Sequence, residues 1–107
     1  MLYNKNMMKK QNIIITSTEI YNKWFSKIKD KGLKIIILAR IEKIKLGNFG
    51  DCKNIGGGVF ELRFMTHGGI RIYYTFKNNV VVLLLNGGNK SSQKRDIEKA
   101  KKIAGEV

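Results

Sequence analysis

The sequence predicts a small α+β domain in which a helical hairpin and a C-terminal helix pack on a mainly antiparallel sheet, in the order βααβββα. Two observations support this prediction. Apolar stripes at helical spacing occupy the first half of the chain, and segments with the character of strands occupy the second half. A chain of 107 residues has room for one domain with one core. We therefore place the domain at residues 12–107 and interpret residues 1–11, which are polar and lack periodicity, as a flexible N-terminal tail.

The first half of the chain is expected to contain one strand and two helices. The β-branched run at 12–16 fits a buried strand, and the residues at 16–19 (TSTE) have the spacing of a capping box that starts a helix. Gly47 is expected to end the second helix, and the glycine-rich segment 48–58 is interpreted as the main loop. Two apolar stripes mark the helices, separated by a turn at 30–32: Ile20, Trp24 and Ile28, then Leu33, Ile37, Ile41 and Ile44.

Three strands and a last helix are expected in the second half. Residues 59–66 and 69–76 alternate in polarity, whereas residues 80–85 are apolar throughout, as in a central strand that is covered on both faces. Asn78-Asn79 is expected to form the turn between the last two strands, because Asn tolerates positive φ. Ser91 or Ser92 then caps the last helix, which turns three side chains inward: Ile97, Ala100 and Ala104.

The chain is strongly basic. Lys and Arg total 21 against 8 Asp and Glu, a formal net charge of +13, which favours a nucleic acid or an acidic protein as partner. Lys accounts for 17 of these 21 residues, so an A/T-rich coding sequence would also explain much of the charge. Both explanations stand, and the four arginines are therefore the more informative cations.

Composition argues against several classes of protein. The single Cys52 allows no intramolecular disulfide, and no apolar stretch is long enough for a membrane span or a signal peptide, so we expect a cytoplasmic protein. One Cys and one His cannot supply a usual zinc site, and the glycine runs lack the spacing of a nucleotide-binding loop. The carboxylates are too few and scattered for paired-carboxylate hydrolysis. No metal and no small-molecule cofactor is expected.

Alternation places Arg63 and Arg71 on one face of a predicted hairpin. Keeping the apolar sets of both strands together requires an odd-numbered loop around 67–69, and a three-residue loop with a glycine bulge fits. Depending on where this loop begins, Arg63 faces either Arg71 or Tyr73 directly. Like charges so placed destabilise a sheet unless they bind an anion, and guanidinium groups suit phosphate oxygens. The alternative is that Glu61, on the same face, neutralises one arginine in a surface salt bridge.

Four other polar residues each allow a functional and a structural interpretation. Lys53 in the glycine-rich loop and Lys90 before the last helix lie at segment ends that can converge on the arginine face, but they also fit ordinary solvated charges. Tyr73 is suited to stack on a base or to move a proton, or it is a half-exposed strand aromatic. His67 stands alone in a turn, which is more typical of a surface residue than of an acid or base.

Four blocks follow one another in a recognisable order: IEKIKLGNFGD at 41–51, VFELR at 59–63, GIRIYY at 69–74 and VLLLNGGNKSSQK at 82–94. In these blocks the chain resembles the HigB-like branch of the RelE/ParE toxin superfamily, over roughly residues 13–104. The resemblance implies a RelE-like fold. It also implies a toxin of a type II toxin-antitoxin system, an endoribonuclease that enters the ribosomal A site and cleaves messenger RNA. A cognate antitoxin, usually with a HigA-like helix-turn-helix domain, would restrain it.

The resemblance also implies a set of site residues. By block position, the basic site residues of the family fall on Lys53, Arg63, Arg71 and Lys90, with Tyr73 as a weaker transfer. We expect the arginines, Lys90 and Tyr73 to take part in catalysis. The arginines are also expected to bind RNA together with Lys53 and Lys94.

The reaction implied is attack by a ribose 2′-hydroxyl on the neighbouring phosphate, which leaves a cyclic phosphate and a free 5′-hydroxyl. It needs a base, an acid, and cations that stabilise the charge on the phosphate; Arg63 and Arg71 suit the last role because arginine stays protonated. Lys53 or Lys90 would exchange protons only where cationic neighbours favour its neutral form. Some relatives use a tyrosine or histidine near the C-terminus as acid or base, but nothing aromatic follows Phe76 here, so these groups stay unassigned.

Two other functions remain open at this stage. Related ParE proteins share the fold and inhibit DNA gyrase without cutting RNA, because a fold alone does not decide function. The chain would also suit a basic nucleic-acid-binding module that has lost its activity, given its charge and its lack of a C-terminal acid or base.

Overall fold

A single five-stranded sheet forms the centre of the molecule. The computed structural model describes residues 12–107, so the expected tail at 1–11 lies outside the described residues. The strand order is β1-β5-β4-β3-β2, with β1 parallel to β5 and the other pairs antiparallel. The elements in chain order are β1 Ile14–Ser17, α2 Glu19–Ser26, α3 Lys31–Lys45, β2 Cys52–Gly56, β3 Val59–Arg63, β4 Arg71–Asn78, β5 Val81–Gly88, the 3-10 turn η1 Lys90–Ser92 and α4 Gln93–Glu106.

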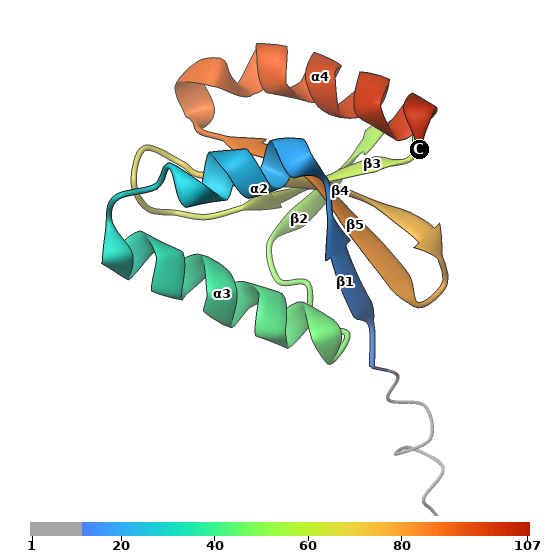
Figure 1. Ribbon diagram of the computed structural model, residues 1–107, viewed down its shortest axis with the longest axis horizontal. Helices are drawn as coiled ribbons and strands as arrows, with labels where there is room; N and C mark the ends of the chain where they lie inside the picture. Colours follow the sequence, from blue (N-terminus) through green and yellow to red (C-terminus); the bar gives the residue numbers. More distant parts are fainter. Residues whose placement is uncertain (1–11) are drawn as a thin grey trace, which may run out of the picture.

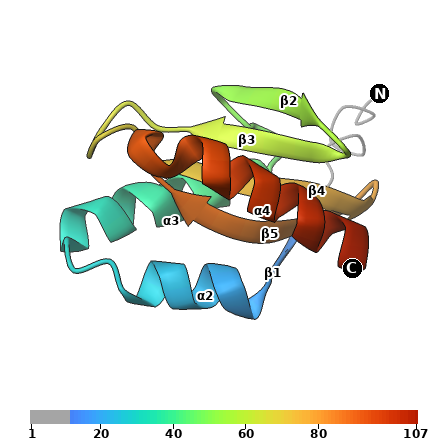
Figure 2. The same cartoon turned by 90° about the horizontal axis from the view of Figure 1, so that it is seen from above.

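Helices cover both faces of the sheet. The hairpin of α2 and α3 lies on one face and α4 on the other (Figures 1 and 2). The expected stripe on α3 is confirmed, because all four of its members are buried against the sheet. The central position of β5 is confirmed as well: Val82 and Leu84 pack under the hairpin, and Leu83 and Leu85 pack under α4. On α4 itself, Ala100 is fully buried against the sheet, and Ile97 and Ala104 pack against the same cluster, as expected for the inward face of that helix.

The strand content differs from the prediction at the glycine-rich segment. Residues 48–58 were expected to be a loop, but Cys52–Gly56 form β2, which pairs with β3 and makes the order βααββββα. The hairpin between them turns at Gly57 and Gly58, both with positive φ. An edge strand with neighbours on one side only does not need an apolar alternation, and β2 is exposed at four of its five residues. The periodicity of the sequence therefore gives no sign of it.

Several local features also differ. The first strand is an exposed edge strand rather than a buried one, with Ile14 at 55% exposure. The side chain of Thr18, not Thr16, caps α2 by accepting the N–H of Tyr21, and it is Tyr21, not Ile20, that is buried. Asn89, rather than either serine, supplies the side-chain cap before α4. The β4–β5 turn consists of residues 79 and 80 rather than Asn78-Asn79, because Asn78 pairs with Val81, and neither asparagine has positive φ.

No helix among residues 12–107 is long and apolar enough to cross a membrane.

Candidate functional site

Arg63 and Arg71 lie directly opposite each other on β3 and β4. The structure thus selects one of the two registers that the sequence allowed. The connection is longer than expected: the N–H of Phe64 donates to the carbonyl of Ile70 at 2.9 Å, so five residues, not three, separate the last paired positions. An odd number of loop residues keeps both arginines on the same face, as the alternation required.

The two arginines line an open pocket of about 500 Å³ at this end of the sheet. Lys90 reaches it from η1, whose backbone is tied to the β3–β4 loop by a bond from the Lys90 N–H to the Gly68 carbonyl at 3.2 Å. Three cations and one carboxylate therefore surround the pocket. Its lining residues are Asp51, Arg63, Phe64, Met65, Gly68, Gly69, Arg71 and Lys90.

Gly69 is required where the loop passes over Arg71. Its φ is +77°, and a Cβ atom built there would lie 2.7 Å from Nη1 of Arg71. That same nitrogen donates to the Gly69 carbonyl at 2.6 Å. A side chain at this position would collide with the guanidinium group and adopt a strained backbone. The glycine thus lets the loop backbone help to hold Arg71 in place.

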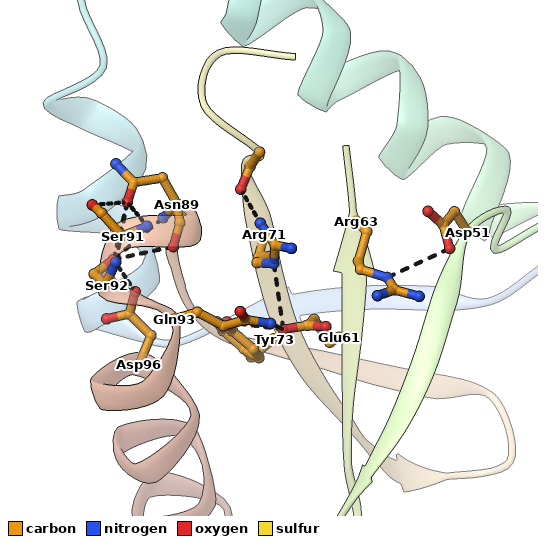
Figure 3. A network of polar contacts seen from close by, with 11 residues as sticks. Asp51, Glu61, Arg63, Arg71, Tyr73, Asn89, Ser91, Ser92, Gln93 and Asp96 are labelled. Carbon is orange, nitrogen blue, oxygen red and sulfur yellow. Dashed lines mark hydrogen bonds and ion pairs between the residues drawn. The ribbon is translucent and has the colours of Figure 1, made fainter. Parts of the chain in front are cut away.

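Arg71 is held in place by the buried carboxylate of Glu61. Glu61 is 1% exposed, and its Oε2 accepts from the Tyr73 hydroxyl at 3.1 Å and from Nε2 of Gln93 at 2.9 Å. The same oxygen lies 3.7 Å from Nε of Arg71 (Figure 3). A salt bridge between Glu61 and an arginine therefore forms, but in the interior rather than at the surface. Because three elements contribute to it, the orientation of Arg71 depends on the packing of α4 against the sheet.

Arg63 is held more loosely by an exposed carboxylate. Its Nε lies 3.6 Å from Oδ1 of Asp51, and the two side chains are 37% and 50% exposed. The segment that carries Asp51 is fixed by Arg40 on α3. The Arg40 guanidinium donates to the carbonyls of Phe49, Asp51 and Arg63 and stacks on the ring of Phe64. Arg40 thereby holds the start of β2 beside the end of β3.

The pocket arginines retain unused donors. The Nε atoms of Arg63 and Arg71 are buried and have no hydrogen-bond partner among residues 12–107, since each carboxylate stands beyond hydrogen-bond distance. A buried donor without a partner costs free energy, on the order of 1–3 kcal/mol for a typical group. Both arginines also line the open pocket together with Lys90, and a cationic pocket of this kind suits an anionic ligand with several oxygens, such as a phosphodiester.

The remaining residues singled out from the sequence lie outside the pocket lining. Tyr73 lies two residues from Arg71 on β4 and opposite Glu61 on β3, and it is fully buried. Burial, followed by the charge of Glu61, raises the pKa of its hydroxyl. It cannot stack on a base in this arrangement. Lys53 is exposed on β2, opposite Glu61 in register, and Lys94 is exposed on the first turn of α4. His67 is in the β3–β4 loop, where Nε2 contacts Asp30 at 2.9 Å and Nδ1 contacts Thr66 at 2.8 Å.

Sequence reasoning missed three residues that build the site. Asp51, Arg40 and Gln93 come from a loop and two helices, so no local periodicity relates them to the arginines. The sign that was available was Arg40 itself, a charged residue that directly follows the apolar run 35–39 and precedes the buried Ile41 on α3. Among residues 12–107 no cluster of three or more His, Cys, Asp or Glu side chains is placed to hold a metal ion.

Known proteins resemble this chain in fold and in sequence. Its fold is similar to that of an E. coli toxin RelE mutant, solved in complex with an antitoxin RelBc peptide, with a TM-score of 0.57 and 13% identity over 82% of this chain and 94% of that one. At that identity the likeness shows the RelE-like fold. An uncharacterised protein of Haemophilus influenzae is 44% identical over 95 residues, which cover 89% of this chain and 96% of the relative. The family described as "Phage derived protein Gp49-like (DUF891)" matches residues 23–105. With most of its length matched to that family, the chain belongs to the phage-derived Gp49-like proteins.

Proposed function

We propose that this protein is the toxin of a type II toxin-antitoxin system and acts in the cytoplasm as a ribosome-dependent endoribonuclease on messenger RNA. The observation that carries the proposal is the cross-strand pair of Arg63 and Arg71, which share an open pocket with Lys90. A site of this kind suits a phosphodiester. The RelE-like fold and the four sequence blocks support the toxin assignment and a place in the HigB-like branch.

In the proposed reaction the two arginines bind the scissile phosphate. Their guanidinium groups stabilise the negative charge that develops on its oxygens as the 2′-oxygen attacks. Lys90, at the pocket edge, donates a proton to the leaving 5′-oxygen. Lys53 and Lys94, both exposed on neighbouring elements, contact the RNA backbone on either side of the pocket. Tyr73 serves this reaction from the interior, through Glu61, rather than as a direct contact.

A cognate antitoxin belongs to the same proposal. The net charge of +13 favours an acidic partner, and the resemblance to HigB-like proteins favours one with a HigA-like helix-turn-helix domain. Co-expression of the protein encoded by the adjacent gene is expected to suppress growth arrest. Arrest that persists with every neighbouring small protein would remove the antitoxin from the proposal.

The test is to induce the chain in actively translating cells and to map messenger ends that carry a 5′-hydroxyl. The unaltered chain is expected to produce new ends within coding regions. Arg63→Ala and Arg71→Ala should each lower the yield of these ends by roughly 10²-fold or more, because each removes a preorganised donor to the developing charge. Full toxicity with unchanged cleavage in both variants would contradict the site assignment.

Lys77→Ala is the matched control. It removes one positive charge from an exposed position near the far end of β4, about 20 Å along the strand from Arg71, and should leave cleavage unchanged. Arg63→Lys keeps the charge but loses the paired donors, so it separates net charge from guanidinium geometry. Accumulation of gyrase-cleaved DNA with intact messengers would favour the ParE-like alternative. Salt-sensitive binding to RNA without cleavage or growth arrest would favour the inactive module.

A further inference from the structure

The proposed cleavage requires a group that removes the proton from the 2′-hydroxyl, and only one carboxylate lines the pocket described above. We infer that Asp51 is this group, a catalytic residue that accepts the 2′-hydroxyl proton. This inference rests on the proposed function of the site. It assigns the role that the amino-acid sequence left open.

The backbone of Asp51 is held in position beside the pocket. Asp51 directly precedes β2 and lies beside Arg63 on β3, whose N–H donates to the Asp51 carbonyl at 2.9 Å. Nη2 of Arg40 donates to the same carbonyl at 2.8 Å. The backbone under the carboxylate is thus fixed from two sides, while the side chain itself remains half exposed. A base must be placed precisely by groups that do not take part in the reaction, and this arrangement provides that support.

The oxygens of the Asp51 carboxylate are available to a ligand. The Asp51 carboxylate lies 3.6 Å from Nε of Arg63, which keeps the two groups together without a hydrogen bond. Within residues 12–107 no donor forms a hydrogen bond to its side-chain oxygens, so they are free to accept from a hydroxyl group that enters the pocket. An acceptor next to the cation that binds the phosphate also lies near the ribose attached to that phosphate.

The other titratable groups nearby are occupied or enclosed. Glu61 is buried and accepts from Tyr73 and Gln93, and the Tyr73 hydroxyl is buried against it. Both ring nitrogens of His67 have partners, and its side chain is absent from the pocket lining. Among the described residues this leaves Asp51 as the only acidic side chain that a bound RNA can reach within the pocket.

The step is balanced with groups that the site contains. Asp51 takes the proton of the 2′-hydroxyl, and the 2′-oxygen forms a bond to phosphorus. The bond from phosphorus to the 5′-oxygen breaks, and Lys90 gives that oxygen a proton. The products are a 2′,3′-cyclic phosphate and a free 5′-hydroxyl, and water returns both side chains to their starting states.

The experiment is single-turnover cleavage on purified ribosomes halted with a messenger codon in the A site, at a position that the mapping experiment shows to be cut. Asp51→Asn keeps the shape of the side chain and should lower the cleavage rate by about 10²- to 10⁴-fold. Ribosome affinity should be unchanged or higher, because a negative charge near RNA has been removed. Asp51→Glu should recover part of the rate. Glu98→Gln, which removes an exposed carboxylate from α4, should leave the rate unchanged.

The dependence on pH separates a base from a structural role. The charged groups around Asp51 are Arg63 from β3, Arg40 from α3, Arg71 from β4 and Lys90 from η1. The cleavage rate of the unaltered chain should depend little on pH between about pH 6 and pH 8, because a side chain and not hydroxide takes the 2′-hydroxyl proton. In Asp51→Asn hydroxide must replace the base, so the rate should rise about 10-fold for each pH unit.

Each outcome decides one question. If the unaltered chain cuts and Asp51→Asn cuts within about threefold of its rate, with the same flat profile, the assignment of Asp51 is wrong and the proposed function stands. If Asp51→Asn loses ribosome affinity and thermal stability together with its rate, Asp51 acts only by holding Arg63. If the unaltered chain cuts no messenger on ribosomes, the proposed function fails and the assignment fails with it.

Discussion

The two faces of the sheet are built differently. The face under α2 and α3 is apolar along its whole length, from Phe64 and Ile70 at one end to Val82 at the other. The face under α4 is divided. Its apolar part packs beneath the helix. Its other part carries Glu61 and the two arginines (Figure 3), and the arginines line the pocket. The face under the helical hairpin supplies most of the core. The face under α4 buries less apolar surface at one end, where it carries charged side chains instead.

The largest effect should come from neighbouring residues on opposite faces of β3. Glu61→Ala removes the anchor of Arg71 and the acceptor of the Tyr73 hydroxyl, and should lower the free energy of unfolding by about 3–5 kcal/mol. Leu62→Ala, on the hairpin face and fully buried, should cost a similar 2–5 kcal/mol by leaving a cavity. Urea denaturation measures both changes.

A triple variant tests whether the buried polar network on the face under α4 is needed for stability or only for cleavage. Glu61→Leu with Arg71→Met and Tyr73→Phe replaces the buried polar groups by apolar ones of similar size, which is often neutral or stabilising for such networks. We expect it to be more stable than Glu61→Ala and to have no cleavage activity. A triple variant as unstable as the single one would mean that this network supports the fold as strongly as the apolar face does.

An intermediate effect should distinguish the two arginines. Arg71 is 12% exposed and faces the buried Glu61, so Arg71→Ala should lower the free energy of unfolding by roughly 1–3 kcal/mol. Arg63 is 37% exposed and its partner Asp51 is half exposed, so Arg63→Ala should cost only about 0–1 kcal/mol. Thermal unfolding of both variants, beside the cleavage assay, tests this difference. Equal losses of stability would show that burial does not distinguish the two ion pairs.

The smallest effect concerns Asp30, which links the helical hairpin to the β3–β4 loop. The N–H of Leu33, and then His67, lower the pKa of its carboxyl. A depressed pKa means that the carboxylate stabilises the fold above the pKa of the unfolded chain and that this contribution is lost as the pH falls through the folded value. Asp30→Asn should therefore be slightly less stable at neutral pH, and the difference should shrink as the pH falls below the ordinary pKa of an aspartate, about 4. Urea denaturation across this range measures it. A difference that persists in acid would mean that the asparagine side chain, and not the loss of the charge, lowers the stability.

Some of the site follows from the sequence through simple rules. The period of two in residues 59–66 and 69–76 places Arg63 and Arg71 on one face, whatever the register. The family blocks added Lys90, and the structure places it at the same pocket. Lys53 and Lys94 stay predictions for RNA contact, because both lie on the surface outside the pocket lining. Local periodicity predicts which residues share a face, because it concerns one strand or helix at a time.

By itself the sequence determined the α+β class, the buried stripe of α3, the doubly covered β5 and the shared face of the two arginines. Only the tertiary structure decided that Arg63 faces Arg71, that Glu61 and Tyr73 lie beneath α4, and that β2 forms within the glycine-rich segment. It also brought Asp51 to the pocket through Arg40. The physical reason is that periodicity sets which residues share a face, whereas register, burial and the meeting of distant segments depend on loop geometry and long-range packing.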